Sequence, residues 1–428
     1  MWYDKTGTNM VFPERMEFMI KLIAADMDGT LLDSQKRLPP DLFDVLGKLR
    51  ERGVRFAVAS GRQYYNLVRQ FPGMENEILF LCENGTMIFD KGAPIFLEPM
   101  DKRDWQALVK QLREIPGACP ILCCPDTAYC EAGGDEFAEN ASMYYEKLKY
   151  VNDLLDVEAN VCKIAVYDLK DAETNSYPAM KKAVEGRFQV TLSGERWIDI
   201  MGESNKGTAL TALEKLCGVS PEETMAFGDY LNDTQMMGAC FTSCAMENAH
   251  PDLKKLARFW VPSNDENGVI RTIRRMTGLD DGIAVLEAPY GSPEYRGNLE
   301  LRDKALRKPL GLDLFSEDLS AEKGYRHFSA VENGEVVGTM MLLPDPDAPG
   351  AFRMKQAAVA ESCRGKGVGR RLWELVKEAA LREGAGKVTV HARKTAAGFY
   401  EKLGFSATGG EFLEVGIPHI PMEFDLRG

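Results

Sequence analysis

The sequence lacks any run of apolar residues approaching the length of a membrane span, and it has no excess of positive charge. A bilayer crossing needs about 20 predominantly apolar residues in succession. The formal net charge of −13 repels nucleic-acid phosphates and anionic lipid surfaces. These absences predict a protein that binds neither membranes nor nucleic acids in general, while a local basic pocket for a small anion stays compatible with them.

The ten cysteines lack the spacing of a metal site. Only those from Cys119 to Cys130 are close in sequence, and they have neither paired C-x-x-C spacing nor a nearby histidine. The first 18 residues are mixed and polar, without the apolar centre of a secretory leader. We therefore expect reduced thiols, a cytoplasmic protein and an N-terminal extension over residues 1–18.

Tandem repeats and low-complexity tracts are also missing, and 428 residues exceed what one hydrophobic core usually organises. Short apolar runs alternate with helical patterns, as where the strand-like Val54–Ala59 precedes the helical Gln63–Phe71. This alternation predicts a parallel, doubly wound sheet. The pattern breaks after Gly85, continues in longer irregular pieces, and resumes after about Ser193, which indicates an inserted segment.

A second domain is predicted beyond the linker-like Gly278–Gly282. There, Asn333-Gly334 lies between two strand-like runs and is typical of a hairpin turn. We predict one domain over residues 19–277, with an insertion at about 86–193, and another over residues 283–428.

Reactive side chains follow the ends of the predicted strands or open a predicted helix. They are Asp26, Asp28, Ser60, Lys206, Asp229 and Asp233. In open α/β sheets the carboxyl ends of the strands share one edge, where ligands bind. Carboxylates crowded there repel one another unless a hard cation lies among them, and oxygen ligands suit Mg²⁺. With a lysine and a hydroxyl beside them, the set is typical of phosphoryl transfer.

These segments, in this order, resemble the haloacid dehalogenase superfamily of phosphatases. The motifs are Asp26-Met27-Asp28-Gly29-Thr30, Ser60-Gly61-Arg62, Lys206 and Gly228-Asp229-Tyr230-Leu231-Asn232-Asp233. The insertion after Glu83-Asn84-Gly85 resembles the Cof-type branch, which carries an α+β cap. The resemblance covers about residues 22–276 and implies a Rossmann-like, doubly wound parallel sheet with that cap inserted.

The resemblance also implies a mechanism. Asp26 would attack phosphorus and form an aspartyl-phosphate, while Asp28 would protonate the leaving oxygen and then activate water. Ser60 and Lys206 would hold the phosphoryl oxygens. The expected substrate is a small phosphorylated metabolite of unknown identity. A phosphosugar mutase, which returns the phosphate to the sugar, is the alternative.

The same resemblance implies a magnesium site. Asp26, the backbone carbonyl of Asp28, and Asp229 would bind Mg²⁺, with Asp233 supporting these ligands. Weaker candidates for orienting the site are Thr30, Gly61 and Asn84. The oligomeric state cannot be predicted from these motifs.

A second group of residues precedes the helical pattern Arg371–Glu383. It contains Arg364, Gly365, Gly367, Gly369 and Arg370. Glycines leave backbone N–H groups uncovered, and a helix N-terminus that carries them favours a pyrophosphate. The spacing differs from the dinucleotide fingerprint G-x-G-x-x-G.

Together with Ala396–Phe405, this loop resembles the GNAT acetyltransferases, over about residues 282–426. The resemblance implies a separate α+β GNAT-fold domain that grips the pyrophosphate of acetyl-CoA and uses Tyr400 to protonate the departing thiolate. The acceptor amine is unknown. Four residues are candidates for the base that activates it, namely Glu361, His391, Glu411 and Glu414. An acetyl-CoA sensor or interaction module without turnover is the alternative.

Overall fold

A computed structural model describes residues 20–184 and 186–427 of the chain. Its described residues divide into two compact units, one over Ile20–Val269 and one from Ile270 onward. The predicted extension over residues 1–18 lies outside the described residues. None of the described helices combines the length and apolar character that a bilayer crossing requires.

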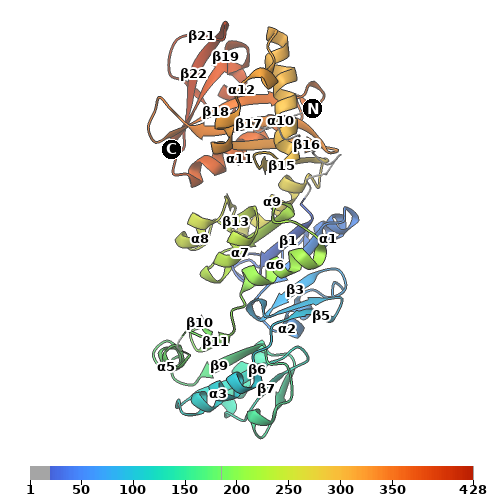
Figure 1. Cartoon of the computed structure of the whole chain (residues 1–428), viewed down its shortest axis with the longest axis vertical. Helices are drawn as coiled ribbons and strands as arrows, with labels where there is room; N and C mark the ends of the chain where they lie inside the picture. The colour runs from blue at the N-terminus through green and yellow to red at the C-terminus, as the bar shows by residue number, and fades with distance from the viewer. Residues whose placement is uncertain (1–19, 185, 428) are drawn as a thin grey trace, which may run out of the picture. The chain divides into compact units, whose positions relative to one another are not determined.

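A central parallel sheet forms the core of the N-terminal unit (Figure 1). Its strands run in the order β14 (Phe259–Val261), β13 (Thr242–Met246), β12 (Thr224–Gly228), β1 (Leu22–Asp26), β2 (Arg55–Ala59) and β3 (Leu79–Cys82). The hairpin of β4 (Met87–Asp90) and β5 (Ala93–Leu97) extends the sheet beyond β3 with antiparallel pairing. Strands β2 and β3 lie on one side of β1 in the sheet, and β12, β13 and β14 lie on the other side. The strand order therefore reverses at β1. Such a switch point opens a ligand crevice at the carboxyl ends of the strands.

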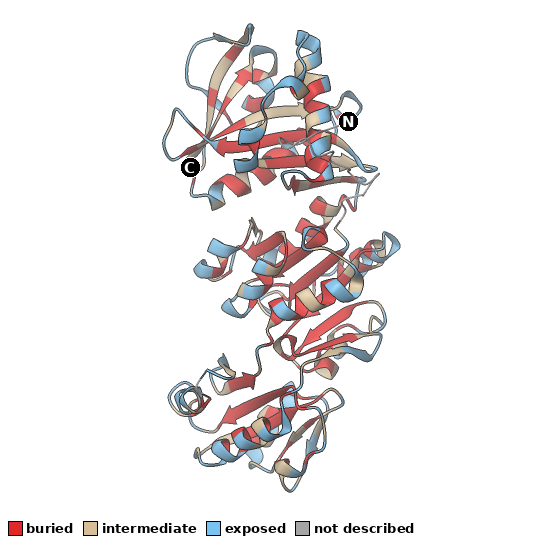
Figure 2. Ribbon diagram, viewed as in Figure 1, coloured by how far each residue is buried: buried red, intermediate tan, exposed pale blue. Residues whose placement is uncertain are grey.

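Helices alternate with these parallel strands along the chain. They are α1 (Leu42–Glu51), α2 (Tyr64–Gln70), α6 (Lys206–Cys217), α7 (Thr234–Ala239), α8 (Pro251–Leu256) and α9 (Gly268–Thr277). The parallel strands are almost entirely buried, as Figure 2 shows. Strands covered in this way read as continuous apolar runs, which is why they were predictable from the sequence.

The inserted cap is a six-stranded sheet in the order β10 (Gln189–Gly194), β11 (Trp197–Met201), β9 (Lys163–Asp168), β6 (Ala118–Cys123), β7 (Ala128–Cys130) and β8 (Leu148–Tyr150). Helices α3 (Lys102–Arg113) and α5 (Ser176–Ala183) bury Trp105 and Met180 in one apolar cluster with Ile164 and Ile200 of the sheet. The third cap helix is α4 (Asp135–Tyr144).

The longer irregular pieces expected in this region, up to Val190, were a wrong prediction beyond α3, because regular strands and helices follow that helix. Every residue of β9 is buried, so no alternation of polar and apolar residues marks it as a strand. Strands β7 and β8 have only three residues each, which is too few for a periodic pattern.

The C-terminal unit is a mainly antiparallel sheet in the order β15 (Ile283–Ala288), β16 (Arg326–Glu332), β17 (Glu335–Pro344), β18 (Ala351–Val359), β19 (Lys387–Arg393), β22 (Ile417–Asp425) and β20 (Ser406–Ala407). The short β21 (Phe412–Glu414) also pairs with β22. Its α-helices are α10 (Pro293–Arg302), α11 (Val368–Arg382) and α12 (Ala397–Lys402), and the last turns of α9 also belong to this unit.

Strands β18 and β19 are the only parallel neighbours of this sheet among the described residues. Their pairing ends at Arg353 and Thr389, although β18 continues to Val359 and β19 to Arg393. Gln356 lies in a bulge of β18 with a left-handed φ of 53°. The two strands therefore separate beyond the paired residues.

Candidate active sites

Asp26 and Lys206 meet at the switch point of the parallel sheet. Asp26 ends β1, and its Oδ1 lies 2.5 Å from Nζ of Lys206. Lys206 opens α6 because Asn205 caps that helix: the Asn205 side chain accepts hydrogen bonds from two backbone N–H groups of the first turn. Nζ of Lys206 also lies 2.7 Å from Oδ1 of Asp233. This lysine is 1% exposed, so both ion pairs are buried.

A third carboxylate, that of Asp229, lies close to the two that pair with this lysine. One oxygen each of Asp26, Asp229 and Asp233 lies within 4.8 Å of the others. Asp229 accepts a hydrogen bond of 2.9 Å from Thr30 Oγ1. Gly29 has φ +84°, and a Cβ there would come within 2.3 Å of the Asp229 carboxylate, so only glycine allows this approach.

The electrostatic balance of this cluster favours a cation. Burial raises the pKa of Asp26, and burial together with the charge of Asp233 raises the pKa of Asp229 to about 6. Loss of solvation is the main cause of both upward shifts, and the neighbouring carboxylates add to it because one lysine cannot neutralise all three. A hard divalent cation bound by carboxylate oxygens would supply the missing positive charge, so the donor set fits Mg²⁺.

Asp28 lies outside this carboxylate cluster. Its carboxylate accepts hydrogen bonds from Arg62 Nη2 at 2.7 Å and from Lys36 Nζ at 2.8 Å. Partial burial opposes ionisation, but these two cations outweigh it and lower the pKa of Asp28. In this conformation the carboxyl is ionised and suits a base. A proton-donating role, as predicted, needs these ion pairs to loosen when a phosphate ester binds.

Ser60, expected to hold phosphoryl oxygens, and the weaker orienting candidates Gly61 and Asn84 form one loop cluster. The backbone N–H of Asn84 donates to the Ser60 carbonyl at 3.0 Å, and a Cβ on Gly61 would press against the Asn84 side chain. Ser60 is buried at the end of β2, and its Oγ accepts a hydrogen bond of 3.2 Å from the Arg62 N–H. The serine hydroxyl is thus held at the carboxyl edge of the sheet.

The cap contacts this loop through a buried lysine that the sequence analysis missed. Lys163 of β9 donates to the Gly61 carbonyl at 3.2 Å and forms ion pairs with Glu83 at 2.6 Å and Asp199 at 3.1 Å. Asn84 donates to the other oxygen of Asp199 at 3.0 Å. No local sequence pattern indicates the role of Lys163, because it lies in an apolar strand and is distant in sequence from the residues it contacts.

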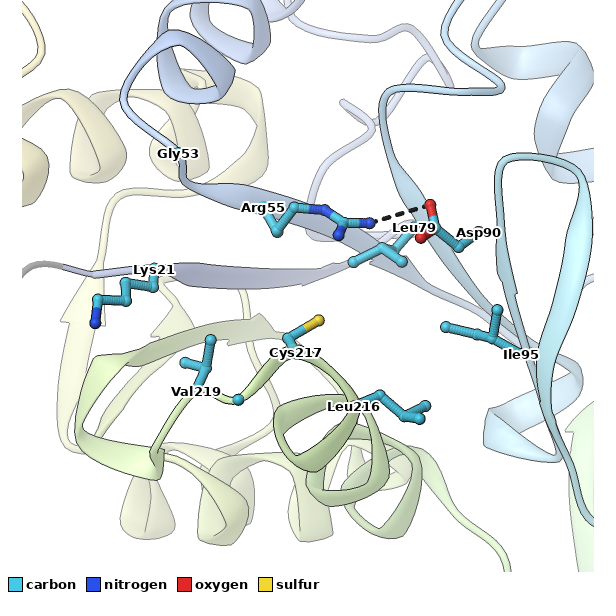
Figure 3. Close-up of a pocket in the computed structure, with 10 residues that line it drawn as sticks. Lys21, Gly53, Arg55, Leu79, Asp90, Ile95, Leu216, Cys217 and Val219 are labelled. Atoms are coloured by element: carbon cyan, nitrogen blue, oxygen red, sulfur yellow. Dashed lines mark ion pairs between the residues drawn. The ribbon is translucent and has the colours of Figure 1, made fainter.

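One cavity of the N-terminal unit lies away from these groups. It measures about 450 Å³ and is lined by residues at the amino ends of the strands, including Lys21, Arg55 and Leu79 (Figure 3). Arg55 crosses it to pair with Asp90 at 3.0 Å. Because catalytic groups of an α/β sheet gather at the carboxyl ends, this cavity does not belong to the candidate active site.

In the C-terminal unit, the glycine-containing loop precedes α11. Gly365 and Gly367 have left-handed φ values of 80° and 78°, and Gly367 caps the helix. The first-turn N–H groups of a helix have no partner within the helix, so they can bind an anion. Gly369 has a packing role as well, because a Cβ there would lie 2.8 Å from the Phe399 ring.

The arginines beside this loop differ in their surroundings. The Arg364 side chain is 64% exposed and lies 3.6 Å from Glu361, and the exposed Arg370 reaches the Lys402 carbonyl at 3.5 Å. Both remain accessible to an anion at the helix N-terminus. Arg371 instead pairs with Asp281 at 2.7 Å.

Tyr400 of α12 lines the second cavity, of about 390 Å³. It is 7% exposed, and burial raises the pKa of its hydroxyl to about 12. The phenol therefore keeps its proton at neutral pH and can donate it, as the predicted role requires. Of the four candidate bases, His391 and Glu414 line this cavity, whereas Glu361 and Glu411 are not among its described lining residues.

Two known families match the two parts of the chain that contain these candidate sites. Residues 23–273 match the family of haloacid dehalogenase-like hydrolases. The chain belongs to this family. Residues 297–426 match the acetyltransferase (GNAT) domain. The chain is thus an enzyme that joins a phosphate-monoester hydrolase to a GNAT acetyltransferase domain, and the predicted families and fold classes are confirmed.

Individual relatives cover mainly the hydrolase. The 5-amino-6-(5-phospho-D-ribitylamino)uracil phosphatase YbjI of Escherichia coli K12 is 34% identical over 278 residues, which are 63% of this chain and 98% of YbjI. An HMP-PP phosphatase of Escherichia coli O6:H1 is 27% identical over 55% of this chain and 87% of its own length. The crystal structure of SMU.1108c from Streptococcus mutans UA159 is 31% identical, with a TM-score of 0.54 over 59% of this chain and 97% of that protein.

Proposed function

We propose that the N-terminal unit is a Mg²⁺-dependent phosphatase that acts through an aspartyl-phosphate on Asp26. The observation that carries this proposal is the cluster of Asp26, Asp229 and Asp233, in which a single buried lysine pairs with two of the three carboxylates. Without a cation the carboxylates of this cluster repel one another. A bound cation would remove that repulsion and would also neutralise a phosphoryl group.

In this proposal the Asp26 carboxylate attacks phosphorus, and Ser60 and Lys206 hold the phosphoryl oxygens. Asp28 protonates the leaving oxygen after the substrate disturbs its contacts with Arg62 and Lys36. The resulting carboxylate then takes a proton from the water that releases phosphate. When bound, Mg²⁺ would be held by Asp26, Asp229 and the Asp28 carbonyl, with Asp233 in support, and would offset the negative charge of the phosphoryl group.

The substrate class that we propose is a phosphate ester of a small metabolite that carries a planar group. An aromatic cluster of the cap supports this: the ring of Trp197 packs edge-on against Tyr144 and Tyr167, and Tyr144 is 48% exposed. Exposed aromatic rings offer stacking surfaces to heterocycles. The uracil in the name of the relative YbjI agrees with that chemistry.

A phosphate-release screen tests this function. The full chain is incubated with Mg²⁺ and phosphate esters that either carry or lack a heterocycle, and free phosphate is measured. Release from heterocyclic esters supports the proposal. Isomerised phosphosugars without free phosphate would instead support a mutase.

For the C-terminal unit we propose acetyl transfer from acetyl-CoA to an amine. Arg364, Arg370 and the N–H groups near Gly367 would bind the pyrophosphate, and Tyr400 would protonate the CoA thiolate. Isothermal titration with acetyl-CoA, followed by CoA-release assays over an amine panel, tests this. Binding without turnover would identify a sensor. We also place the enzyme in the cytoplasm, since its ten cysteines are free thiols and suit a reducing compartment.

A further inference from the structure

A cavity of about 390 Å³ in the C-terminal unit contains ionisable side chains that acetyl-CoA binding alone does not require. Residues of β18 and β19 line it where these strands separate. Tyr400 reaches it from α12, and residues around β21 and the start of β22 close another side. Tyr400, the expected proton donor to the CoA thiolate, therefore lines the same cavity as these further groups, and we call this cavity the chamber.

His391 and Glu414 pair within this chamber. Nδ1 of His391 lies 3.0 Å from Oε2 of Glu414. Since an ionised carboxylate only accepts hydrogen bonds, Nδ1 carries the proton and Nε2 keeps a free lone pair. A histidine oriented in this way can accept a proton at Nε2, and the carboxylate stabilises the imidazolium that forms.

The other candidates fit a base less well. Glu361 is 88% exposed, and Glu411 is ion-paired with Lys394 at 2.6 Å. His419 does line the cavity, but its Nδ1 donates to a backbone carbonyl, which carries no charge to stabilise an imidazolium. His419 is also buried, whereas His391 is only half-buried.

Three further cationic side chains line the chamber, namely Arg307, Lys355 and Arg393. Arg307 is neutralised by a bidentate ion pair with Glu317, at 2.6 and 3.2 Å. Lys355 of β18 and Arg393 of β19 also line the cavity, and within the described part of the chain neither makes an ion pair. Both are half-buried, so an unmatched anion in the chamber would gain from their charge.

We propose, given an acetyltransferase function for this domain, that the chamber takes a primary amine carrying a carboxylate or phosphate group. Lys355 binds that anionic group, with Arg393 adding to the positive field. His391 is the base, and Glu414 is a positioning residue that holds its ring. A polycationic acceptor such as a polyamine is disfavoured by the same charges.

The reaction balances with these groups. Nε2 of His391 takes one proton from the substrate ammonium, and the freed amine attacks the thioester carbonyl. A C–N bond forms and the C–S bond breaks. The CoA thiolate takes the Tyr400 proton, Tyr400 regains one from the attacking nitrogen, and His391 releases its proton to water. The products are an amide, free CoA thiol and one proton.

The test measures CoA release by the full chain with four acceptors: an amino acid, an aminoalkyl phosphate, a neutral amino alcohol and a polyamine. We expect turnover of one or both anionic amines in preference to the other two. Lys355→Met should raise KM for the anionic amine about tenfold and leave KM for the amino alcohol unchanged. Comparing turnover of the amino acid with turnover of the aminoalkyl phosphate distinguishes recognition of a carboxylate from recognition of a phosphate.

Variants of the base complete the test. His391→Gln should lower kcat by about 10²–10⁴-fold, with acetyl-CoA affinity by titration unchanged. His419→Gln, a histidine of the same chamber, is the matched control and should retain most of the activity. Added imidazole should partly restore the activity of His391→Gly. A purely structural role of His391 would not explain such a rescue. Glu414→Gln should lower kcat with little effect on KM.

The outcomes separate the two levels of proposal. Preferred turnover of a polyamine, or full activity of His391→Gln, would overturn the assignment of this chamber while leaving acetyl transfer intact. Acetyl-CoA binding without turnover of any amine would overturn the base assignment and identify a sensor. Failure of the wild-type chain to bind acetyl-CoA would overturn the acetyltransferase proposal itself.

Discussion

Two buried lysines of the N-terminal unit, Lys206 and Lys163, each lie between two carboxylates, yet their surroundings differ. Lys206 faces Asp26 and Asp233 at the carboxyl edge of the sheet, where a further carboxylate approaches. Lys163 faces Glu83 and Asp199 where the cap meets the core, and amide and backbone groups complete its contacts. Both lysines are almost fully buried.

The difference lies in the charge balance. At Lys206 the additional Asp229 leaves two negative charges unmatched, and the pKa of both Asp26 and Asp229 is raised. At Lys163 one carboxylate remains in excess, and Asn84 donates to it. Burial raises the pKa of Glu83 there as well, although Lys163 opposes this shift. We infer that the first cluster is built to receive a cation and the second to hold cap and core together.

The largest expected effect concerns the nucleophile. Asp26→Asn should lower phosphate release by about 10⁴-fold or more, because the amide cannot form the acyl-phosphate. Steady-state assays with the best ester from the substrate screen measure this. Acetyl-CoA affinity of the same variant is the control and should not change. Residual turnover near the wild-type level would exclude Asp26 as the nucleophile.

A second prediction compares the two lysines directly. Lys163→Met should destabilise the N-terminal unit by about 3–5 kcal/mol, because it leaves buried carboxylates unpaired. Lys206→Met should cost a similar amount without Mg²⁺, but saturating Mg²⁺ should restore much of that loss. Urea unfolding with and without Mg²⁺ measures both. Equal rescue of the two variants would remove the distinction between the clusters.

Mg²⁺ binding itself should stabilise the wild-type unit by about 2.7 kcal/mol at a hundredfold excess over Kd. Asp229→Asn should abolish this gain, because it removes a ligand and one of the unmatched charges. Asp199→Asn is the matched control, since this carboxylate belongs to the Lys163 cluster. Thermal unfolding monitored during an Mg²⁺ titration gives the result, and a retained Mg²⁺ response in Asp229→Asn would place the cation elsewhere.

The smallest expected effect is on pH dependence without metal. The pKa of Asp229 is about 6 in the folded chain, against about 3.9 for an unperturbed aspartate, so folding favours its protonated form. In EDTA, the stabilisation that comes from protonated Asp229 is fully present below pH 4 and is lost as the pH rises through about 6. The free energy of unfolding falls by about 2 kcal/mol over this range. Asp229→Asn should show a smaller decline. An identical pH profile for both proteins would contradict the raised pKa.

The parallel strands and their reactive ends could be predicted because both leave local marks. Buried strands such as β1 and β2 are short continuous apolar runs, and Asp26 ends the first while Ser60 directly follows the second. The cap strands could not be predicted in the same way. Strand β9 is buried along its whole length and its neighbours β7 and β8 are only three residues long, so neither an alternating polar pattern nor the flanking sequence identified it.

The contacts between distant residues were likewise beyond prediction. Lys163 is far along the chain from Glu83, and the pairing of Asp28 with Arg62 depends on how two loops approach each other. In the C-terminal unit, four residues were equal candidates for a base until the fold set His391 beside Glu414.

The order of the motifs, the alternation of strands and helices, and the chemical character of each loop were determined by the sequence alone, because they depend on residues close together along the chain. Which carboxylates share a lysine, and which histidine faces a carboxylate, was decided only by the tertiary structure. Such pairings depend on the register and approach of separate elements, and burial then turns a separation of a few ångströms into a large electrostatic effect.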